Sequence, residues 1–378
     1  MEKRIFLSSP HMCGEEMKYI QEAFDTNWVA PLGKNVDMFE QEICQYVGRE
    51  FAVALSSGSA AIHLGLRWLG VGENDIVFCS SFTFIGSCNA IDYCKAKPVF
   101  VDSEYSSWNM SAVALEKAYE KYPRPKAIVI VNLYGNPADF ERLLAIAKAH
   151  GTAVLEDAAE SLGSRYKGIA TGSFGDVSIV SFNGNKIITT SGGGMALVND
   201  KKARDKMLFW ATQSRENSLW YQHEEIGYNY RLSNICAGIG RGQLTALDLR
   251  VCQKRRIFQI YCEEFANVEQ IKMIPEPKNC FCNHWLSLIT LSRECKTTFV
   301  DIINALAKEN IESRPAWKPM HMQPVYANCD FFSSLDKGSV AQDLFERSLC
   351  LPSDTKMTES QVRFVAEIVK KTIAEKEK

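Results

Sequence analysis

The stretch "KAIVIVNLYGNPADFERLLAIAKAHGTAVLED" (126–157) contains the pattern that determines the fold class. Two runs rich in Val, Ile and Ala, at 126–132 and 152–157, flank a helix-like segment at 136–151. Pro137 stands near the start of this segment and Gly151 at its end, the positions that these residues favour at helix termini. A strand, a helix and a second strand in this order predict two parallel strands joined by a helix.

The same alternation extends over residues 51 to about 200. The runs are apolar almost throughout, which is typical of strands buried on both faces. They predict an α/β fold with a mostly parallel sheet covered by helices. The further strands are expected at 51–55, 75–79, 98–102, 177–182 and 195–199, and the further helices at 59–70 and 109–122.

The pattern changes after about residue 245. A long basic helix is expected from Gln243 to about Phe265, followed by a strand at 284–291, a helix at 298–309 and a terminal helix from about Glu359. With 378 residues, the chain is long for a single core. We therefore expect an N-terminal segment and a large domain in residues 1–245, and a smaller α+β domain in residues 246–378.

The bulk composition excludes several classes of protein. The chain is 46% hydrophobic and 23% charged, with a net charge of −2, so no overall attraction to nucleic acid or to anionic membranes is expected. No segment approaches the roughly 18 apolar residues of a membrane span, and the first residues lack the core of a signal peptide. The thirteen cysteines are scattered without any C-x-x-C, so we expect no metal, free thiols and a cytoplasmic protein.

Lys186 stands in the loop-like stretch "SFNGNKIITTSGGG" (181–194). A lysine in such a loop is most often solvated. A nucleotide P-loop does not fit, because Asn185 precedes the lysine and Ile187 follows it. A dinucleotide fingerprint is also missing, since "GIGRGQ" (238–243) ends in Gln. A lysine that forms an imine with pyridoxal phosphate remains as the chemical interpretation.

A pyridoxal phosphate site needs, besides the lysine, a carboxylate, an anion cradle and a flat group against the ring. Asp157 ends one strand, residues 57–59 lie between another strand and a helix, and Phe84 and Ser181 follow two further strands. Each has a simpler interpretation alone, as a helix cap, a turn or a core residue. Their order at the ends of successive strands favours a cofactor site at the carboxyl edge of the sheet.

Longer motifs make the chain recognisable. It resembles the DegT/DnrJ/EryC1/StrS family of nucleotide-sugar aminotransferases along nearly its whole length, and UDP-4-amino-sugar transaminases of the bacillosamine type most of all. The resemblance implies a fold-type-I transferase dependent on pyridoxal 5'-phosphate. The motifs that carry it are "SSPHMCGEE" (8–16), "NWVAPLG" (27–33), "SFTFIGS" (81–87), "LYGN" (133–136), "EDAAESLGS" (156–164), "SFNGNKIITTSGGGM" (181–195), "GYNYRLSN" (227–234) and "RPAWKPMHMQP" (314–324).

The resemblance also implies a role for individual residues. Lys186 would form the imine, Asp157 would pair with the pyridinium nitrogen, and Ala159 and Phe84 would lie on the two sides of the ring. The phosphate would be held by Gly58, Ser59, Ala60 and Ser181, and by Asn229 of the neighbouring subunit in a homodimer with shared sites. Glu160 departs from the Gln or His of many relatives and would contact the cofactor hydroxyl or the sugar. The run 191–194, "SGGG", departs from the acidic residue that many relatives carry there.

The expected reaction moves the amino group of L-glutamate to the C4 keto carbon of a UDP-linked 2-acetamido-2,6-dideoxy sugar, leaving 2-oxoglutarate. Lysine at position 186, where related sugar dehydratases carry histidine, favours amine transfer over loss of water. Each of the residues expected around the sugar nucleotide has an alternative interpretation as core or solvated surface. They are Asn27, Trp28, Ala30, Arg314, Trp317, Lys318 and His321.

Three alternatives stay open at this point. The substrate could be another dTDP-, GDP- or UDP-linked sugar with its keto group at C3 or C4. The chain could be a catalytically silent regulatory homologue, although the intact Lys186 and Asp157 pair argues against this. A nucleotide-sugar oxidoreductase or epimerase would need the dinucleotide fingerprint that the sequence lacks.

Overall fold

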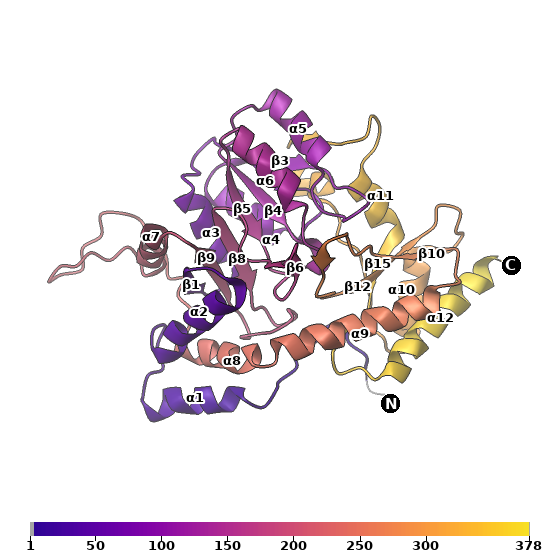
Figure 1. The fold of residues 1–378 in the computed structure, drawn as a ribbon, viewed down its shortest axis with the longest axis horizontal. Helices are drawn as coiled ribbons and strands as arrows, with labels where there is room; N and C mark the ends of the chain where they lie inside the picture. Colours follow the sequence, from indigo (N-terminus) through magenta and orange to yellow (C-terminus); the bar gives the residue numbers. More distant parts are fainter. Residues whose placement is uncertain (1–3, 378) are drawn as a thin grey trace.

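The computed structural model describes residues 4–377 and contains an eight-stranded sheet at its centre (Figure 1). Five neighbouring pairs of strands are parallel, and only β9 runs antiparallel to its two neighbours, so the expectation of a mostly parallel sheet is confirmed. The strand order is β1 (Phe51–Leu55), β9 (Gly194–Val198), β8 (Val177–Ser181), β5 (Ala153–Asp157), β4 (Ala127–Val131), β2 (Ile76–Ser80), β3 (Lys97–Val101) and β14 (Phe331–Phe332).

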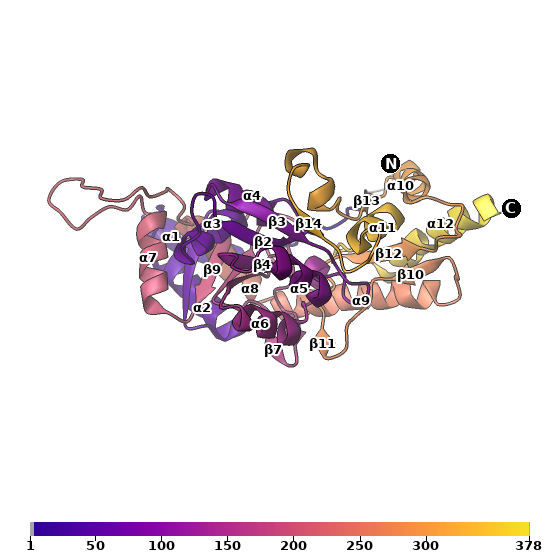
Figure 2. The same cartoon turned by 90° about the horizontal axis from the view of Figure 1, so that it is seen from above.

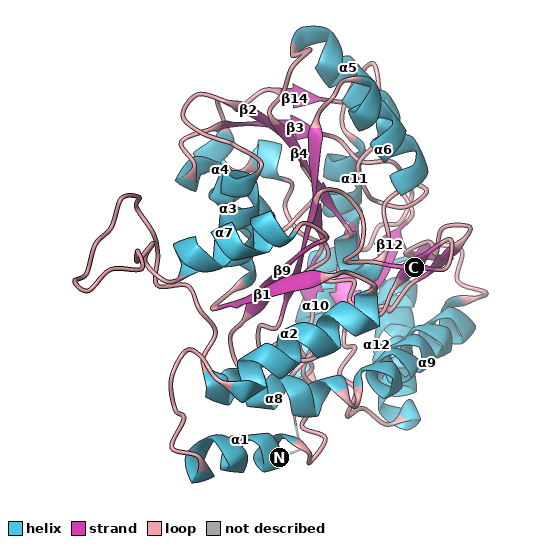
Figure 3. Ribbon diagram, turned by 60° about the vertical axis from the view of Figure 1, so that its left-hand side comes forward, coloured by secondary structure: helices cyan, strands magenta, loops and turns pink. Residues whose placement is uncertain are grey.

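Helices cover both faces of this sheet, as Figures 2 and 3 show. Alternate residues of one strand enter different cores: Val53 of β1 packs with one helix layer, and Ala52 packs with the other. This two-sided burial explains why the strand sequences are apolar without alternation. One face carries α3 (Gly58–Trp68), α4 (Gly86–Tyr93) and α7 (Lys201–Ala211), and the other carries α2 (Lys34–Val47), α5 (Ala112–Lys121), α6 (Phe140–Ala149) and α8 (Asn234–Leu244).

A second, antiparallel sheet lies in the C-terminal part of the chain. Its strands, in order, are β10 (Ile271–Met273), β12 (Ser287–Leu291), β15 (Ser348–Leu351) and β13 (Arg314–Pro315). A separate apolar core joins it to α9 (Leu247–Phe265), α10 (Phe299–Lys308) and α12 (Glu359–Glu377). The remaining elements are α1 (Glu16–Asp25), α11 (Val340–Arg347), three short helices, η1 (Leu133–Gly135), η2 (Met320–Met322) and η3 (Pro324–Tyr326), and a small sheet of β11 (Cys280–Phe281), β6 (Arg165–Tyr166) and β7 (Ile169–Ala170).

The structure differs from the sequence expectations at several helix and strand starts. The helix expected from Gln243 to Phe265 is wrong as a single element, because α8 ends at Leu244 and α9 begins at Leu247. At this break the Thr245 hydroxyl and N–H both bond to the carbonyl of Gly242, a local arrangement that competes with the continuing helix.

Two other starts are set by local backbone geometry. The helix expected at 136–151 begins only at Phe140, because the Asp139 side chain caps it by accepting the N–H of Arg142. The strand expected from residue 284 begins at Ser287, since His284 has a positive φ of 48° that a strand does not allow. The division at residues 245 and 246 stays a prediction, and β14 returns from the C-terminal part to pair with β3.

The sheet directions bring the important strand ends to one edge. Because β9 is antiparallel to both β1 and β8, these two strands run the same way, as β8 and β5 also do. The segments that follow β1, β5 and β8 therefore leave the same edge of the sheet. A long loop after α7, by contrast, projects away from the body (Figure 1) and ends near Asn229, which pairs with Thr212.

Candidate active site

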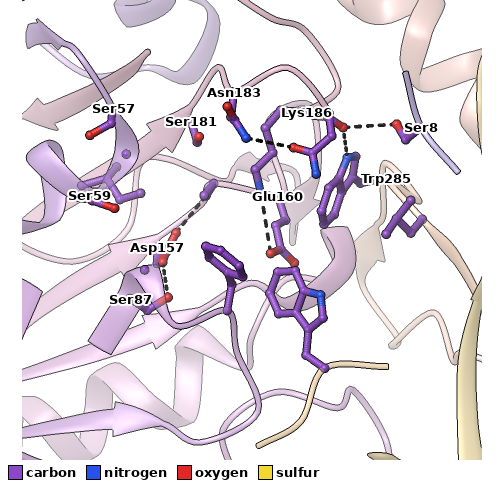
Figure 4. Close-up of a pocket in the computed structure, with 18 of the residues that line it drawn as sticks. Ser8, Ser57, Ser59, Ser87, Asp157, Glu160, Ser181, Asn183, Lys186 and Trp285 are labelled. Atoms are coloured by element: carbon purple, nitrogen blue, oxygen red, sulfur yellow. Dashed lines mark hydrogen bonds and ion pairs between the residues drawn. The ribbon is translucent and has the colours of Figure 1, made fainter. Parts of the chain in front are cut away.

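A cavity of about 570 Å³ lies at the carboxyl edge of the large sheet, where the second sheet meets it (Figure 4). The segments after β1, β5 and β8 form one side of it. The C-terminal part contributes Trp285, Glu312, Arg314 and Trp317. Ten of the residues expected at the site line this cavity, namely Gly58, Ser59, Phe84, Asp157, Ala159, Glu160, Ser181, Lys186, Arg314 and Trp317.

Lys186 points into the cavity from the loop between β8 and β9 (Figure 4). Its side chain is only 11% exposed, which contradicts the solvated-loop alternative. The Nζ atom lies 4.2 Å from the centre of the Trp285 ring and 3.7 Å from Glu160 Oε1. The loop is fixed at its turn by two hydrogen bonds to the Asn185 carbonyl, from Trp285 Nε1 at 2.8 Å and from Ser8 Oγ at 3.2 Å. The amine is thus held in place within an enclosed, partly aromatic environment.

Asp157 occupies the last position of β5 and is 4% exposed. Its Oδ2 accepts a hydrogen bond from Ser87 Oγ at 2.7 Å, and its Oδ1 accepts one from the Ala159 N–H at 3.0 Å. Burial raises the pKa of the Asp157 carboxyl, and these two donors and the charge of Lys186 oppose the rise. A cation placed against this carboxylate would stabilise its ionised form further.

The first turn of α3 lies across the cavity from Lys186. Ser57 caps the helix by accepting the Ala60 N–H at 3.1 Å, so that amide has a partner within the chain, and Ala60 does not line the cavity. At Gly58 and Gly194 the backbones of this turn and of β9 nearly touch, because a Cβ atom on Gly194 would lie 2.4 Å from Gly58 N. Ser59 and Ser181 complete a small polar wall at a helix N-terminus, which suits a phosphate group.

Glu160 is a second buried carboxylate in the cavity, 5% exposed. Oε2 accepts the N–H of Tyr134 at 2.6 Å, and Oε1 faces Lys186. Burial raises the pKa of the Glu160 carboxyl to about 7, against the opposing effects of the Lys186 charge and the Tyr134 N–H. The cavity thus contains two carboxylates with different surroundings, an arrangement often found where protons are transferred.

Aromatic rings and one guanidinium form the mouth of the cavity. Phe84 is 56% exposed, with its ring centre 5.2 Å from that of Trp317. Arg314 lines the cavity with a side chain that is 65% exposed, and its ion-pair partner is Glu312 at 3.0 Å. Arg314 and Lys186 are the two basic residues among those that line the cavity.

Six of the expected site residues lie outside this cavity in a single chain, besides Ala60: Asn27, Trp28, Ala30, Asn229, Lys318 and His321. Asn229 is exposed beside the projecting loop. Trp28 is 47% exposed and lines a separate hollow of about 280 Å³ near Asn234, whose N–H donates to the Ala30 carbonyl. Asn27 lies at the same turn with a φ of 55°. Their contacts within one chain neither assign nor remove a role, so the roles of these residues stay predictions.

Lys318 and His321 follow Trp317 but turn away from the cavity lining. The His321 ring stacks on Phe331, with centres 3.8 Å apart, and its Nδ1 lies 2.7 Å from Ser81 Oγ. Burial lowers the pKa of His321 to about 4, so the ring is neutral at pH 7. His321 is thus half-buried with partners inside its own chain, and its expected role in substrate contact stays a prediction.

Several cavity residues were not expected from the sequence. Ser87, which fixes Asp157, stands in the motif "SFTFIGS" but was given no role. Trp285 and Glu312 reach the cavity only because the second sheet packs against the first, and Ser8 reaches it through the N-terminal segment. Ser87 and Ser8 thus both stand in motifs that are visible in the sequence, whereas Trp285 and Glu312 stand in none of them.

The residue types at the cavity fit pyridoxal phosphate. A poorly exposed lysine, a strand-end carboxylate, a helix N-terminus with small polar residues, and an exposed aromatic ring all face one space. Among residues 4–377, no group of three or more His, Cys, Asp or Glu side chains is placed to hold a metal ion. Within the same residues, no helix is long and apolar enough to cross a membrane.

Comparisons with known proteins cover nearly the whole chain. The model of the DegT/DnrJ/EryC1/StrS aminotransferase family matches residues 10–370. EpsN of Bacillus subtilis (strain 168) is 50% identical over 373 residues, which are 98% of this chain and 96% of that protein. GDP-perosamine synthase of Escherichia coli O157:H7 is 37% identical over 375 residues, 99% and 100% of the two chains. The crystal structure of a DegT DnrJ EryC1 StrS aminotransferase from Brucella abortus matches with a TM-score of 0.86 at 27% identity, covering 95% of each chain.

Proposed function

Because the chain belongs to the DegT/DnrJ/EryC1/StrS aminotransferase family, we propose that it transfers the amino group of L-glutamate to the 4-keto carbon of a UDP-linked 2-acetamido-2,6-dideoxy sugar. Its fold is that of fold-type-I transferases, and it is an aminotransferase dependent on pyridoxal phosphate. The product would be a UDP-4-amino sugar of the bacillosamine type. The observation that carries the proposal is that Lys186 and Asp157 face one cavity with a polar wall at a helix N-terminus.

The residues present would hold the cofactor in a defined way. Lys186 would carry its carbonyl carbon, Asp157 its ring nitrogen, and the turn at residues 57–59 with Ser181 its phosphate. When bound, pyridoxal phosphate supplies an electron sink that makes the Cα proton of an amino acid acidic. The Lys186 amine, placed 4.2 Å from the Trp285 ring and largely excluded from water, would take that proton at Nζ.

The substrate's sugar diphosphate requires a cation or N–H donors, which the net charge of −2 does not provide globally. Arg314 is placed at the cavity mouth beside Trp317, where a guanidinium and an indole suit a nucleotide. Asn27, Trp28 and Asn229 would reach a cavity only in the other subunit of a homodimer, which we therefore include in the proposal. Lys318 and His321 do not line the cavity, and their expected contacts with the substrate stay predictions.

The experiment is a substrate panel. The purified protein with pyridoxal phosphate and L-glutamate is incubated with UDP-, GDP- and dTDP-linked keto sugars, and products are identified by mass spectrometry and NMR. We expect an amino group at C4 of the UDP-linked 2-acetamido sugar. Transfer to GDP- or dTDP-linked sugars alone, or at C3, would contradict the proposal.

A GDP-linked keto sugar is the second candidate. The observation that favours it is the 37% identity with GDP-perosamine synthase over 99% of this chain. The same panel decides between the two candidates.

A further inference from the structure

Asp157 and Glu160 both line the cavity, but the two carboxylates differ in how many of their oxygens accept a hydrogen bond from the chain. Asp157 has each oxygen occupied by a hydrogen-bond donor, Ser87 on one side and the Ala159 N–H on the other. Glu160 has only Oε2 occupied, by the N–H of Tyr134. Its Oε1 lies 3.7 Å from Lys186 Nζ, as the dashed line in Figure 4 shows. One carboxylate is therefore fixed by neutral donors, while the other has an oxygen facing the reactive amine.

The backbone of Tyr134 holds Glu160 in this orientation. Tyr134 is a buried non-glycine residue with a φ of 54°, a strained conformation that persists only where the surroundings hold it. Its hydroxyl accepts the N–H of Trp317 at 2.9 Å, which ties the residue to the wall of the cavity. Its own N–H is thereby directed at Glu160 Oε2, and Oε1 remains directed at Lys186.

We propose that Glu160 accepts the proton that the amino donor must lose on entering the cavity, and that it shares this proton with Lys186 during the glutamate half-reaction. This inference rests on the proposed function. The donor arrives as an ammonium ion and becomes a nucleophile only after it gives one N–H proton to Glu160 Oε1, which becomes a carboxylic acid. With pyridoxal phosphate bound, the donor nitrogen would form a bond to the cofactor's carbonyl carbon while the bond from that carbon to Lys186 Nζ breaks, so that Nζ leaves as a neutral amine. Lys186 Nζ would by then have passed the Cα proton on to the cofactor and be neutral again, so the acid proton of Glu160 can return to it. This gives an ammonium and a carboxylate, and no oxidant or reductant is required.

The surroundings suit this exchange. Burial raises the pKa of Glu160 to about 7, so the carboxyl can both take and release a proton near neutral pH. The titratable groups facing it are Lys186, Asp157, Cys350 and the Tyr134 hydroxyl. Burial raises the pKa of Cys350 to about 12 and that of Tyr134 well above its usual value, so both are neutral. Lys186 and Asp157 are then the neighbours whose charges act on the Glu160 carboxyl, Lys186 to lower its pKa and Asp157 to raise it.

The first test uses the cofactor-free protein and no substrate. Trace acetylation with acetic anhydride at pH 7.5, followed by peptide mass spectrometry, gives the rate at which Lys186 reacts relative to the exposed Lys167. In Glu160→Gln, which keeps an oxygen for the Tyr134 N–H but carries no charge, we expect Lys186 to react about tenfold faster or more, because the carboxylate no longer stabilises its ammonium form. The control variant is Glu141→Gln, which removes one negative charge at an exposed carboxylate and should leave the Lys186 rate unchanged. Because Glu141 pairs with Lys167, another exposed lysine serves as the reference in this variant. An unchanged Lys186 rate in Glu160→Gln would overturn the sharing of a proton.

The second test is the pH profile of the glutamate half-reaction, followed by the change in cofactor absorbance in single turnovers. The wild-type rate should rise with pH through about 7, and Glu160→Gln should lose this rise and be roughly 10²- to 10⁴-fold slower at pH 8. Glu160→Asp, which keeps a carboxyl group, should retain a rise with pH. A rise that persists unchanged in Glu160→Gln would overturn the assignment, whereas failure to aminate any keto sugar would refute only the proposed function. If Glu160→Gln does not fold, Glu160→Asp decides, since loss of the rise there would also contradict the inference.

Discussion

Replacement of Asp157 by asparagine separates the charge of this residue from its structural contacts. The amide side chain would keep an oxygen for the Ala159 N–H, and Ser87 could turn its hydroxyl toward Thr83 Oγ1, which lies 2.9 Å away. The fold should therefore lose only about 1 kcal/mol, the usual contribution of one hydrogen bond. For a chain of this size that corresponds to a fall in Tm of roughly 2–4 °C.

The chemistry should suffer far more than the fold. A carboxylate within about 4–6 Å of a cation shifts that cation's proton equilibrium by about 1–3 pKa units, and each unit corresponds to about 1.4 kcal/mol. If this stabilisation is expressed in the transition state, Asp157→Asn should slow the glutamate half-reaction by roughly 10- to 10³-fold.

The assay combines stopped-flow absorbance of the glutamate half-reaction with the thermal unfolding of the same samples. Ser87→Ala is the matched variant, because it removes the hydroxyl that donates to Asp157 but keeps the charge. It should slow the half-reaction much less than Asp157→Asn does. A near wild-type rate in Asp157→Asn, with cofactor bound, would refute the reasoning that this carboxylate supports the ring nitrogen.

The remaining predictions concern four other residues. Lys186→Arg should abolish turnover in the substrate panel while leaving Tm nearly unchanged, because its guanidinium cannot form an imine, and residual turnover would contradict this. Asn229→Ala should weaken pyridoxal phosphate binding by roughly ten- to a hundredfold, because one charge-assisted hydrogen bond is lost. If two chains share each site, refolding the Asn229→Ala and Lys186→Ala variants together should give more activity than the sum of the two variants alone. Unchanged activity in confirmed heterodimers would refute shared sites. Glu156→Ala should lower the free energy of unfolding by about 3–5 kcal/mol, measured by urea unfolding, because the buried carboxylate accepts bonds from four donors; Glu156→Gln should cost less. Burial lowers the pKa of Lys254 to about 7, below the value of about 10.4 for an unfolded lysine. Between these two values the unfolded chain binds more protons than the folded one, so the stability of the fold should rise with pH. Lys254→Met should remove this contribution to the rise of Tm with pH.

The sequence predicted the large sheet well because its strands are local features. The runs at 51–55 (FAVAL) and 127–131 (AIVIV) are apolar at every position, and burial on both faces produces such runs directly. The two-residue strand β14 was not predicted, since Phe331 and Phe332 pair with β3 only through tertiary packing. The break between α8 and α9 was also missed, because apolar periodicity continues through it and only the Thr245 side chain marks it.

The residues expected to hold the cofactor could be placed together from the sequence more readily than those expected around the sugar nucleotide. Asp157 and Ser181 end parallel strands, and strand ends of one sheet edge meet whatever the rest of the chain does. Trp285 and Glu312, by contrast, belong to segments whose distance from Lys186 depends on how the second sheet packs. Asn229 does not line the cavity of its own chain, and the proposed contact with a second copy of the chain is not encoded by any local pattern.

The covalent bond between Lys186 and pyridoxal phosphate is the central claim, and borohydride reduction tests it directly. The purified protein is saturated with the cofactor, reduced, digested and mapped by mass spectrometry. The mass of a reduced pyridoxyl phosphate adduct should appear on the peptide that contains Lys186 and be absent from Lys186→Ala. An adduct on any other lysine, or none in a protein that binds the cofactor, would contradict the account.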